Sequence, residues 1–194
     1  MTTAAVRRSG YVLAALAAIA ATVTVVALAL PGHPTGHAFP TPAPTGWPRA
    51  ALPGGTAVLS YPPSPRPLPG DKGTVSAARL GPGGTFQLYL NATPRQGAET
   101  LARWAAFRLK FLRADNAAGA RLDAAAQRVR FRGGTGSRVI DDYLTKIGAH
   151  HVEEIACLVQ GRTSASVIVA AAPAASWAEV RPLLFQAVAA YQVR

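Results

Sequence analysis

The sequence predicts an α+β fold in which an antiparallel sheet of about six to seven strands packs against two amphipathic helices, preceded by one N-terminal transmembrane helix. Short segments with alternating apolar residues are separated by turns that contain glycine, a pattern typical of neighbouring antiparallel strands. Residues 98–115 and 176–191 instead repeat apolar residues every three or four positions, which is typical of helices that bury one face.

The transmembrane helix is predicted at residues 11–30, which contain no charge, glycine or proline. A helix of this length spans the roughly 30 Å hydrocarbon core of a bilayer. Arg7 and Arg8 precede it, and the next cation is Arg49. Since cations stay on the cytoplasmic side, we expect residues 1–10 in the cytoplasm and the C-terminal domain outside the cell. A cleaved signal peptide is the alternative, although its apolar core would be only about 7 to 15 residues; both export the same domain.

Residues 31–55 follow the anchor and hold seven prolines and five glycines. This composition predicts an extended linker that holds the domain away from the membrane. The remaining residues, 56–194, are enough for one domain with its own core.

The composition also bears on partners. The chain has 20 Lys and Arg against 9 Asp and Glu, a formal net charge of +11. Such a charge favours an anionic polymer of the cell envelope or a protein partner, and export argues against nucleic acid. Biased base composition is the alternative source of the arginines. Cys157 is the only cysteine, which excludes an intramolecular disulfide; its place in an alternating apolar segment predicts a buried strand residue.

Seven segments are predicted as strands from their apolar alternation and the glycine-bearing turns between them. They are residues 56–61, 74–80, 85–90, 125–132, 137–146, 150–160 and 163–171. The short turns predict an antiparallel meander. Residues 62–70 are rich in proline and are expected to form a surface loop that joins no strand ladder.

The helix at 98–115 places Leu101, Trp104, Ala105, Phe111 and Leu112 on one predicted buried arc. Arg108 falls within this arc. We expect its stem to snorkel past the sheet edge; the alternative is an ion pair with Asp141 or Asp142.

The helix at 176–191 begins with Ser176 and Glu179 in the spacing of a capping box. Pro182 predicts either a kink or a helix that starts at Arg181 after one separate turn.

Four short motifs together resemble the extracytoplasmic PsbP-like domain family, which includes LpqN-type bacterial proteins. They are Tyr61-Pro62 after the first strand, the first long helix at 98–113, Phe131-Arg132-Gly133 before a hairpin, and Ala172-Pro173-Ala174 followed by Trp177 before the last helix. The family's tryptophan after the first tyrosine-proline pair is missing, with Pro65 or Arg66 near its place. The resemblance implies a sheet sandwiched by helices and a binding or accessory role, and it supplies no catalytic residue.

The remaining chemical candidate is a metal site at His151 and Glu153, with Asp142 or Asp141 of the neighbouring strand. Residues two apart on a strand share a face, and imidazole and carboxylate are metal ligands. The alternative is that the polar ends of adjacent strands carry complementary charges, with Glu153 and Glu154 paired with arginines across the sheet. Nucleophile elbows and phosphate-binding loops are not found.

The sequence therefore predicts a membrane-anchored extracytoplasmic binding, sensing or accessory module without catalytic residues or a cofactor. The alternative is an exported metal-dependent enzyme that uses the cluster of His151, Glu153 and Asp141 or Asp142.

Overall fold

The structure is a computed structural model that describes residues 40–115 and 119–194. The predicted transmembrane helix at 11–30 lies outside these residues. Within the two described ranges, no helix is long and apolar enough to cross a membrane.

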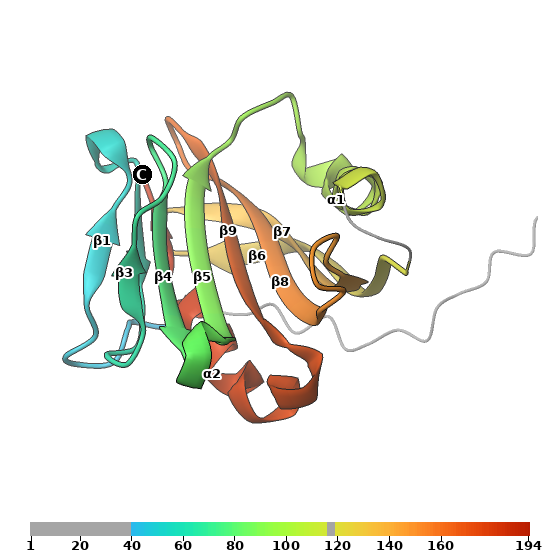
Figure 1. Cartoon of the computed structure of the whole chain (residues 1–194). Coiled ribbons are helices and arrows are strands. Elements are labelled where there is room, and N and C mark those ends of the chain that lie inside the picture. The colour runs from blue at the N-terminus through green and yellow to red at the C-terminus, as the bar shows by residue number, and fades with distance from the viewer. Residues whose placement is uncertain (1–39, 116–118) are drawn as a thin grey trace, which may run out of the picture. The chain divides into compact units, whose positions relative to one another are not determined.

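The main sheet has seven antiparallel strands in the order β3-β4-β5-β9-β8-β7-β6 (Figure 1). Their bounds are β3 Arg66–Leu68, β4 Val75–Leu80, β5 Phe86–Pro94, β6 Arg121–Phe131, β7 Gly134–Leu144, β8 His151–Gln160 and β9 Ala165–Pro173. With two helices packed on it, this sheet confirms the predicted α+β class. The simple meander is wrong in one respect: β6 to β9 run back along the sheet, so β5 pairs with β9 and not with β6.

The loop predicted to join no ladder contains β3, which pairs with β4. Pro67 has no backbone N–H to donate, and a strand with such a residue fits only at the edge of a sheet. β3 is the edge strand on this side.

A second sheet has the order β1-β2-β10, with β1 Arg49–Ala51, β2 Ala57–Ser60 and β10 Gln192–Val193. β1 lies within the predicted linker, so the linker boundary at residue 55 is wrong. Pairing of β1 with β2 buries Leu52 against the core, which gives this segment an apolar anchor despite its prolines.

The two helices cover opposite faces of the main sheet. Residues alternate between faces along β8, and Ile155 and Cys157 belong to the core cluster that includes α2, Trp177–Ala189. Their neighbours Ala156 and Leu158 instead contact α1, Trp104–Asp115. Cys157 is fully buried, which confirms its predicted place in the core.

The α2 side holds the larger core, to which the small sheet also contributes. Its fully buried large side chains are Leu52, Leu59, Leu88, Leu90, Ile155, Ile168, Leu184 and Tyr191. Helix α2 runs through Pro182, preceded by a single 3₁₀ turn, Ala174–Ser176. The predicted capping box is not formed, because the Ser176 hydroxyl donates to the carbonyl of Pro173 instead.

On the other face, α1 follows a 3₁₀ turn at Leu101–Arg103. Trp104 packs on β7 and β8, and its indole N–H donates to the carbonyl of Ala156 at 3.0 Å. Trp104, Arg108 and Leu112 are buried at a spacing of four, whereas Phe111 is 46% exposed. The predicted buried arc was therefore wrong for Phe111, because the helix presents a narrower face to the sheet.

The C-terminus closes the fold beside the β6–β7 turn. Val193 N–H donates to the carbonyl of Arg132, and Arg194 N–H to that of Thr56. Gly133 lies against this backbone at φ +85°, and a Cβ there would overlap the carbonyl oxygen of Val193.

We expect Gly133→Ala to lower the free energy of unfolding by about 3 kcal/mol or more, measured by urea denaturation. The left-handed backbone costs a residue with a Cβ about 1 to 2 kcal/mol, and the overlap adds to it. Gly84→Ala is the matched control, since Gly84 has φ +77° and open space around it. Equal losses for the two variants would show that the C-terminal contact does not stabilise the fold.

Candidate binding cleft

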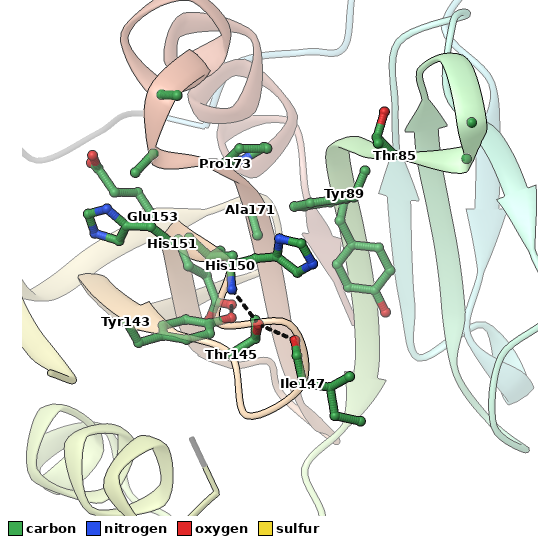
Figure 2. A pocket seen from close by; sticks show the side chains of 17 residues that line it. Thr85, Tyr89, Tyr143, Thr145, Ile147, His150, His151, Glu153, Ala171 and Pro173 are labelled. Carbon is green, nitrogen blue, oxygen red and sulfur yellow. Dashed lines mark hydrogen bonds between the residues drawn. The ribbon is translucent and has the colours of Figure 1, made fainter. Parts of the chain in front are cut away.

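A cleft of about 1180 Å³ opens on the sheet face that carries α1 (Figure 2). The β7–β8 hairpin, the turn before β5 and the segment after β9 surround it. The side chains that define its character are Phe86, Tyr89, Tyr143, Thr145, Ile147, His150, Glu154 and Pro173.

The floor of the cleft is one row of residues across neighbouring strands. Tyr89 of β5 lies opposite Ala171 of β9, which lies opposite Glu154 of β8. Directly opposite residues of antiparallel strands point to the same face. The small side chain of Ala171 therefore separates a tyrosine from a carboxylate and leaves space between them.

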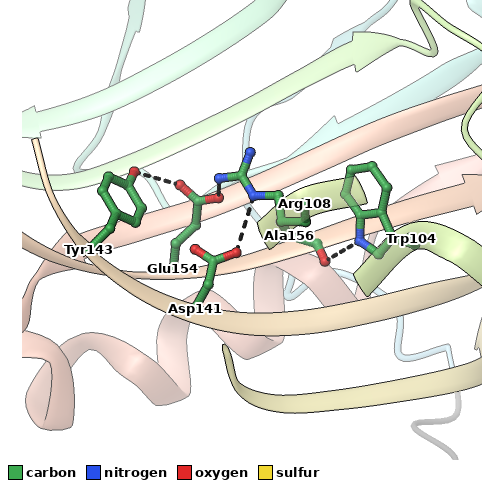
Figure 3. A network of polar contacts seen from close by, with 6 residues as sticks. All are labelled: Trp104, Arg108, Asp141, Tyr143, Glu154 and Ala156. Carbon is green, nitrogen blue, oxygen red and sulfur yellow. Dashed lines mark hydrogen bonds and ion pairs between the residues drawn. The ribbon is translucent and has the colours of Figure 1, made fainter. Parts of the chain in front are cut away.

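Beyond Glu154, the row continues to Asp141 of β7, and both carboxylates meet Arg108 of α1 (Figure 3). The Arg108 Nε donates to Asp141 Oδ2 at 3.1 Å, and its Nη2 pairs with Glu154 Oε1. Tyr143 OH donates to Glu154 Oε2 at 2.9 Å. Arg108 is only 9% exposed, Glu154 3% and Asp141 0%. The expectation that Arg108 snorkels was wrong, and the alternative ion pair with Asp141 is formed.

Sequence reasoning missed Glu154 as the second partner of Arg108. Local sequence carried no signal for this pairing, because strand register decides which β8 residue faces Asp141. Removing one partner of such a buried pair costs about 3 to 5 kcal/mol, since the other charge stays buried.

The network holds one cation and two carboxylates, and this shapes its protonation. Burial raises the pKa of Asp141 to about 7; Glu154 also raises it, while Arg108 lowers it. Burial and then Glu154 raise the pKa of Tyr143 far above its ordinary value. For Arg108, burial lowers the pKa, but Glu154 and Asp141 outweigh it, so the guanidinium stays charged.

Of the predicted metal candidates, Asp141 belongs to this network, and His151, Glu153 and Asp142 lie apart from it. His151 Nε2 contacts Asp142 Oδ2, and Arg121 Nε lies 3.3 Å from Asp142 Oδ1. Glu153 is opposite Asp142 in register, and burial followed by Asp123 and Asp142 raises its pKa.

The structure thus brings His151 and Asp142 together and places Glu153 beside them, while Asp141 points to the other face. Among residues 40–115 and 119–194, no group of three or more His, Cys, Asp or Glu side chains is arranged to hold a metal ion. Of the two glutamates that the alternative paired with arginines, Glu154 meets Arg108, although this arginine comes from α1 and not from the sheet; across the strands, Arg121 pairs with Asp142.

Comparison with known proteins identifies the fold. The Ran-binding protein Mog1p of Saccharomyces cerevisiae aligns with TM-score 0.54 and 13% identity, covering 76% of this chain and 95% of that chain. Cyanobacterial PsbP (CyanoP) of Synechocystis sp. PCC 6803 aligns with TM-score 0.52 and 13% identity, covering 76% and 92%. The chain therefore shares the fold of Mog1p and CyanoP, which supports the PsbP-like architecture that the sequence motifs implied.

LpqN of Mycobacterium tuberculosis, involved in cell envelope biogenesis, aligns with TM-score 0.45 and 16% identity, covering 79% of this chain and 89% of that chain. This score is too low to carry an argument. No protein-family model matches the chain, and no curated protein matches it in sequence.

We expect the free energy of unfolding to fall as the pH rises from about 4 to about 7, by about 1 kcal/mol per pH unit from Asp141 alone. The folded state holds the Asp141 proton to about pH 7, whereas the unfolded chain releases it near its ordinary value of 3.8. This contribution is complete below pH 3.8 and is lost through pH 7.

Asp141→Asn removes the titration, so the fall across this range should become smaller in urea denaturation series. Asp71→Asn is the control, because Asp71 is exposed and lies outside the network. Parallel pH profiles for wild type and Asp141→Asn would contradict the raised pKa.

Proposed function

We propose that this chain is a membrane-anchored extracytoplasmic module that binds a ligand or partner without catalysing a reaction, and that the cleft is its binding site. The observation that carries the proposal is the cleft itself. Its volume is of the order that small-molecule sites have, and it combines aromatic walls with a few convergent polar groups.

The polar groups at the cleft are arranged for rigidity. Both oxygens of Glu154 already have partners, and Arg108 ties this residue to α1. A general base must be within reach of a substrate proton, and the carboxylate of Glu154 is already held by Arg108 and Tyr143. This favours binding over the alternative of an exported metal-dependent enzyme.

The comparisons support a binding or accessory role at the level of the fold. Mog1p is described as Ran-binding, and CyanoP is a PsbP protein. Because one fold supports many functions, the argument for this chain rests on its own cleft.

The location of the module is proposed from the sequence. Residues 11–30 suffice to span a bilayer, and Arg7 and Arg8 favour a cytoplasmic N-terminus. The cleft would then face the exterior, where envelope polymers, proteins and small molecules are the available partners.

A photo-crosslinking amino acid at Ile147 should capture a discrete partner or envelope component in intact cells. Ile147 is 88% exposed and lies at the cleft, so a bound partner passes within reach of it. The same amino acid at Arg162, in the exposed β8–β9 turn away from the cleft lining, is the control. Identical capture from both positions, or none from Ile147, would contradict the cleft as the binding site.

A topology reporter fused after Arg194 tests the location. We expect a reporter that is active only outside the cytoplasm to be active in this fusion, and one that is active only inside to be silent. Reversing the charge of Arg7 and Arg8 to Glu should reduce correct insertion, since these cations set the orientation. A fusion active only in the cytoplasm would overturn the extracytoplasmic assignment.

A further inference from the structure

Resting on the proposed function, we infer that the cleft takes a ligand with a cationic group, an ammonium or guanidinium, on an apolar or aromatic body. Three features of the cleft lead to this class of ligand: the charges of its lining, its aromatic walls and the bonding state of Glu154.

The lining contrasts in charge with the whole chain. Lys and Arg outnumber Asp and Glu by 20 to 9 in the sequence, yet the cleft has the carboxylate of Glu154 on its floor and neither Lys nor Arg in its lining. A site for an anionic ligand would concentrate cations. Among residues 40–115 and 119–194, the lysines and arginines therefore lie outside the cleft lining.

A second cavity shows where cations do gather. About 470 Å³ in size, it lies between α2 and β6 and includes Arg130 and Arg138 in its lining. The guanidinium groups of Arg138 and Arg181 each lie 5.2 Å from the ring centre of Phe185 there. The anionic partner that the composition favours fits this side of the molecule better than the cleft.

The walls of the cleft supply aromatic faces. Phe86 and Tyr89 meet edge to face with ring centres 6.3 Å apart, and Tyr143 lines the cleft at the end of β7. Figure 2 shows Tyr89 and Tyr143 on either side of His150. Aromatic faces attract cations, and the attraction grows when water is excluded.

Glu154 supplies the negative charge. Its carboxylate has about four acceptor positions, and Arg108 and Tyr143 occupy one on each oxygen. When both are ionised, which for Asp141 requires a pH above its pKa of about 7, Glu154 and Asp141 exceed the single charge of Arg108 by one. A ligand cation beside Glu154 would balance this excess charge. It would not require the hydrogen bonds and ion pairs of the network to rearrange.

Three compounds with one phenyl skeleton and different charge test this inference: phenethylamine, 2-phenylethanol and 3-phenylpropanoate. Binding to the full chain in lipid nanodiscs is measured by titration calorimetry, with empty nanodiscs subtracted because phenethylamine partitions into lipid. We expect phenethylamine to bind at least tenfold more tightly than either other compound.

Two variants locate the binding. Tyr89→Leu should weaken phenethylamine at least threefold by removing an aromatic face, and Glu154→Gln should weaken it at least fivefold by removing the charge. Phe185→Leu is the matched control, an aromatic residue of the second cavity, and should leave the affinity unchanged. Melting temperatures identify any variant that is unfolded. If Glu154→Gln is unfolded, Tyr143→Phe is used in its place. This change frees an acceptor position on Glu154 and keeps the aromatic ring, so the affinity for phenethylamine should be retained or raised.

Stronger binding of 3-phenylpropanoate or 2-phenylethanol, or equal binding of all three, would overturn the preference for cations. If Tyr89→Leu weakened those compounds, the cleft would remain the binding site, and the proposed function would stand. Binding of none of the three would overturn this inference, and crosslinking at Ile147 decides the proposed function independently, because it does not depend on the charge of the partner.

Discussion

The guanidinium of Arg108 joins α1 to the middle of the sheet, and the cleft depends on this junction. It holds Asp141 of β7 and Glu154 of β8 side by side. The hydroxyl of Tyr143 donates a hydrogen bond to the second carboxylate oxygen of Glu154. Two carboxylates this close repel each other unless a cation or a proton lies between them. Arg108 supplies the cation, while burial and then Glu154 raise the pKa of Asp141 to about 7.

This network also explains why the cleft lies where it does. Helix α1 covers β6 to β8, and its apolar contacts are Trp104 and Leu112 on either side of Arg108. The remaining part of the same face, over β5 and β9, carries Tyr89 and the small Ala171. Where the part of the sheet that α1 covers meets the uncovered part, a charged network therefore lies on one side and aromatic rings lie on the other. This arrangement suits a ligand with one charged and one apolar end.

Much of the fold could be predicted because it follows from local patterns. Alternation along 150–160 predicted β8 almost to the residue, and the glycine turns predicted its antiparallel neighbours. The limits of local reasoning appear at β3, which contains Pro67, and at β1, which lies between Pro48 and Pro53. Both are strands because a neighbouring strand supplies the pairing. The predicted burial of Phe111 was wrong because the sheet surface that α1 contacts is distant in the sequence. The predicted capping box at Ser176 was wrong because a nearby backbone carbonyl competes for the hydroxyl.

The sequence by itself determined the residue types available for function: a buried arginine on a helical arc, paired carboxylates on strands, an apolar segment long enough to span a membrane and a single cysteine that packs in the core. Only the tertiary structure decided which of them meet. Register placed Glu154, rather than Glu153, beside Asp141 and Arg108, while Asp142 lies with His151 and Arg121 on the opposite face. The physical reason is that strands alternate faces with a period of two, so the pairing across strands, which local sequence does not encode, selects the partners of every side chain.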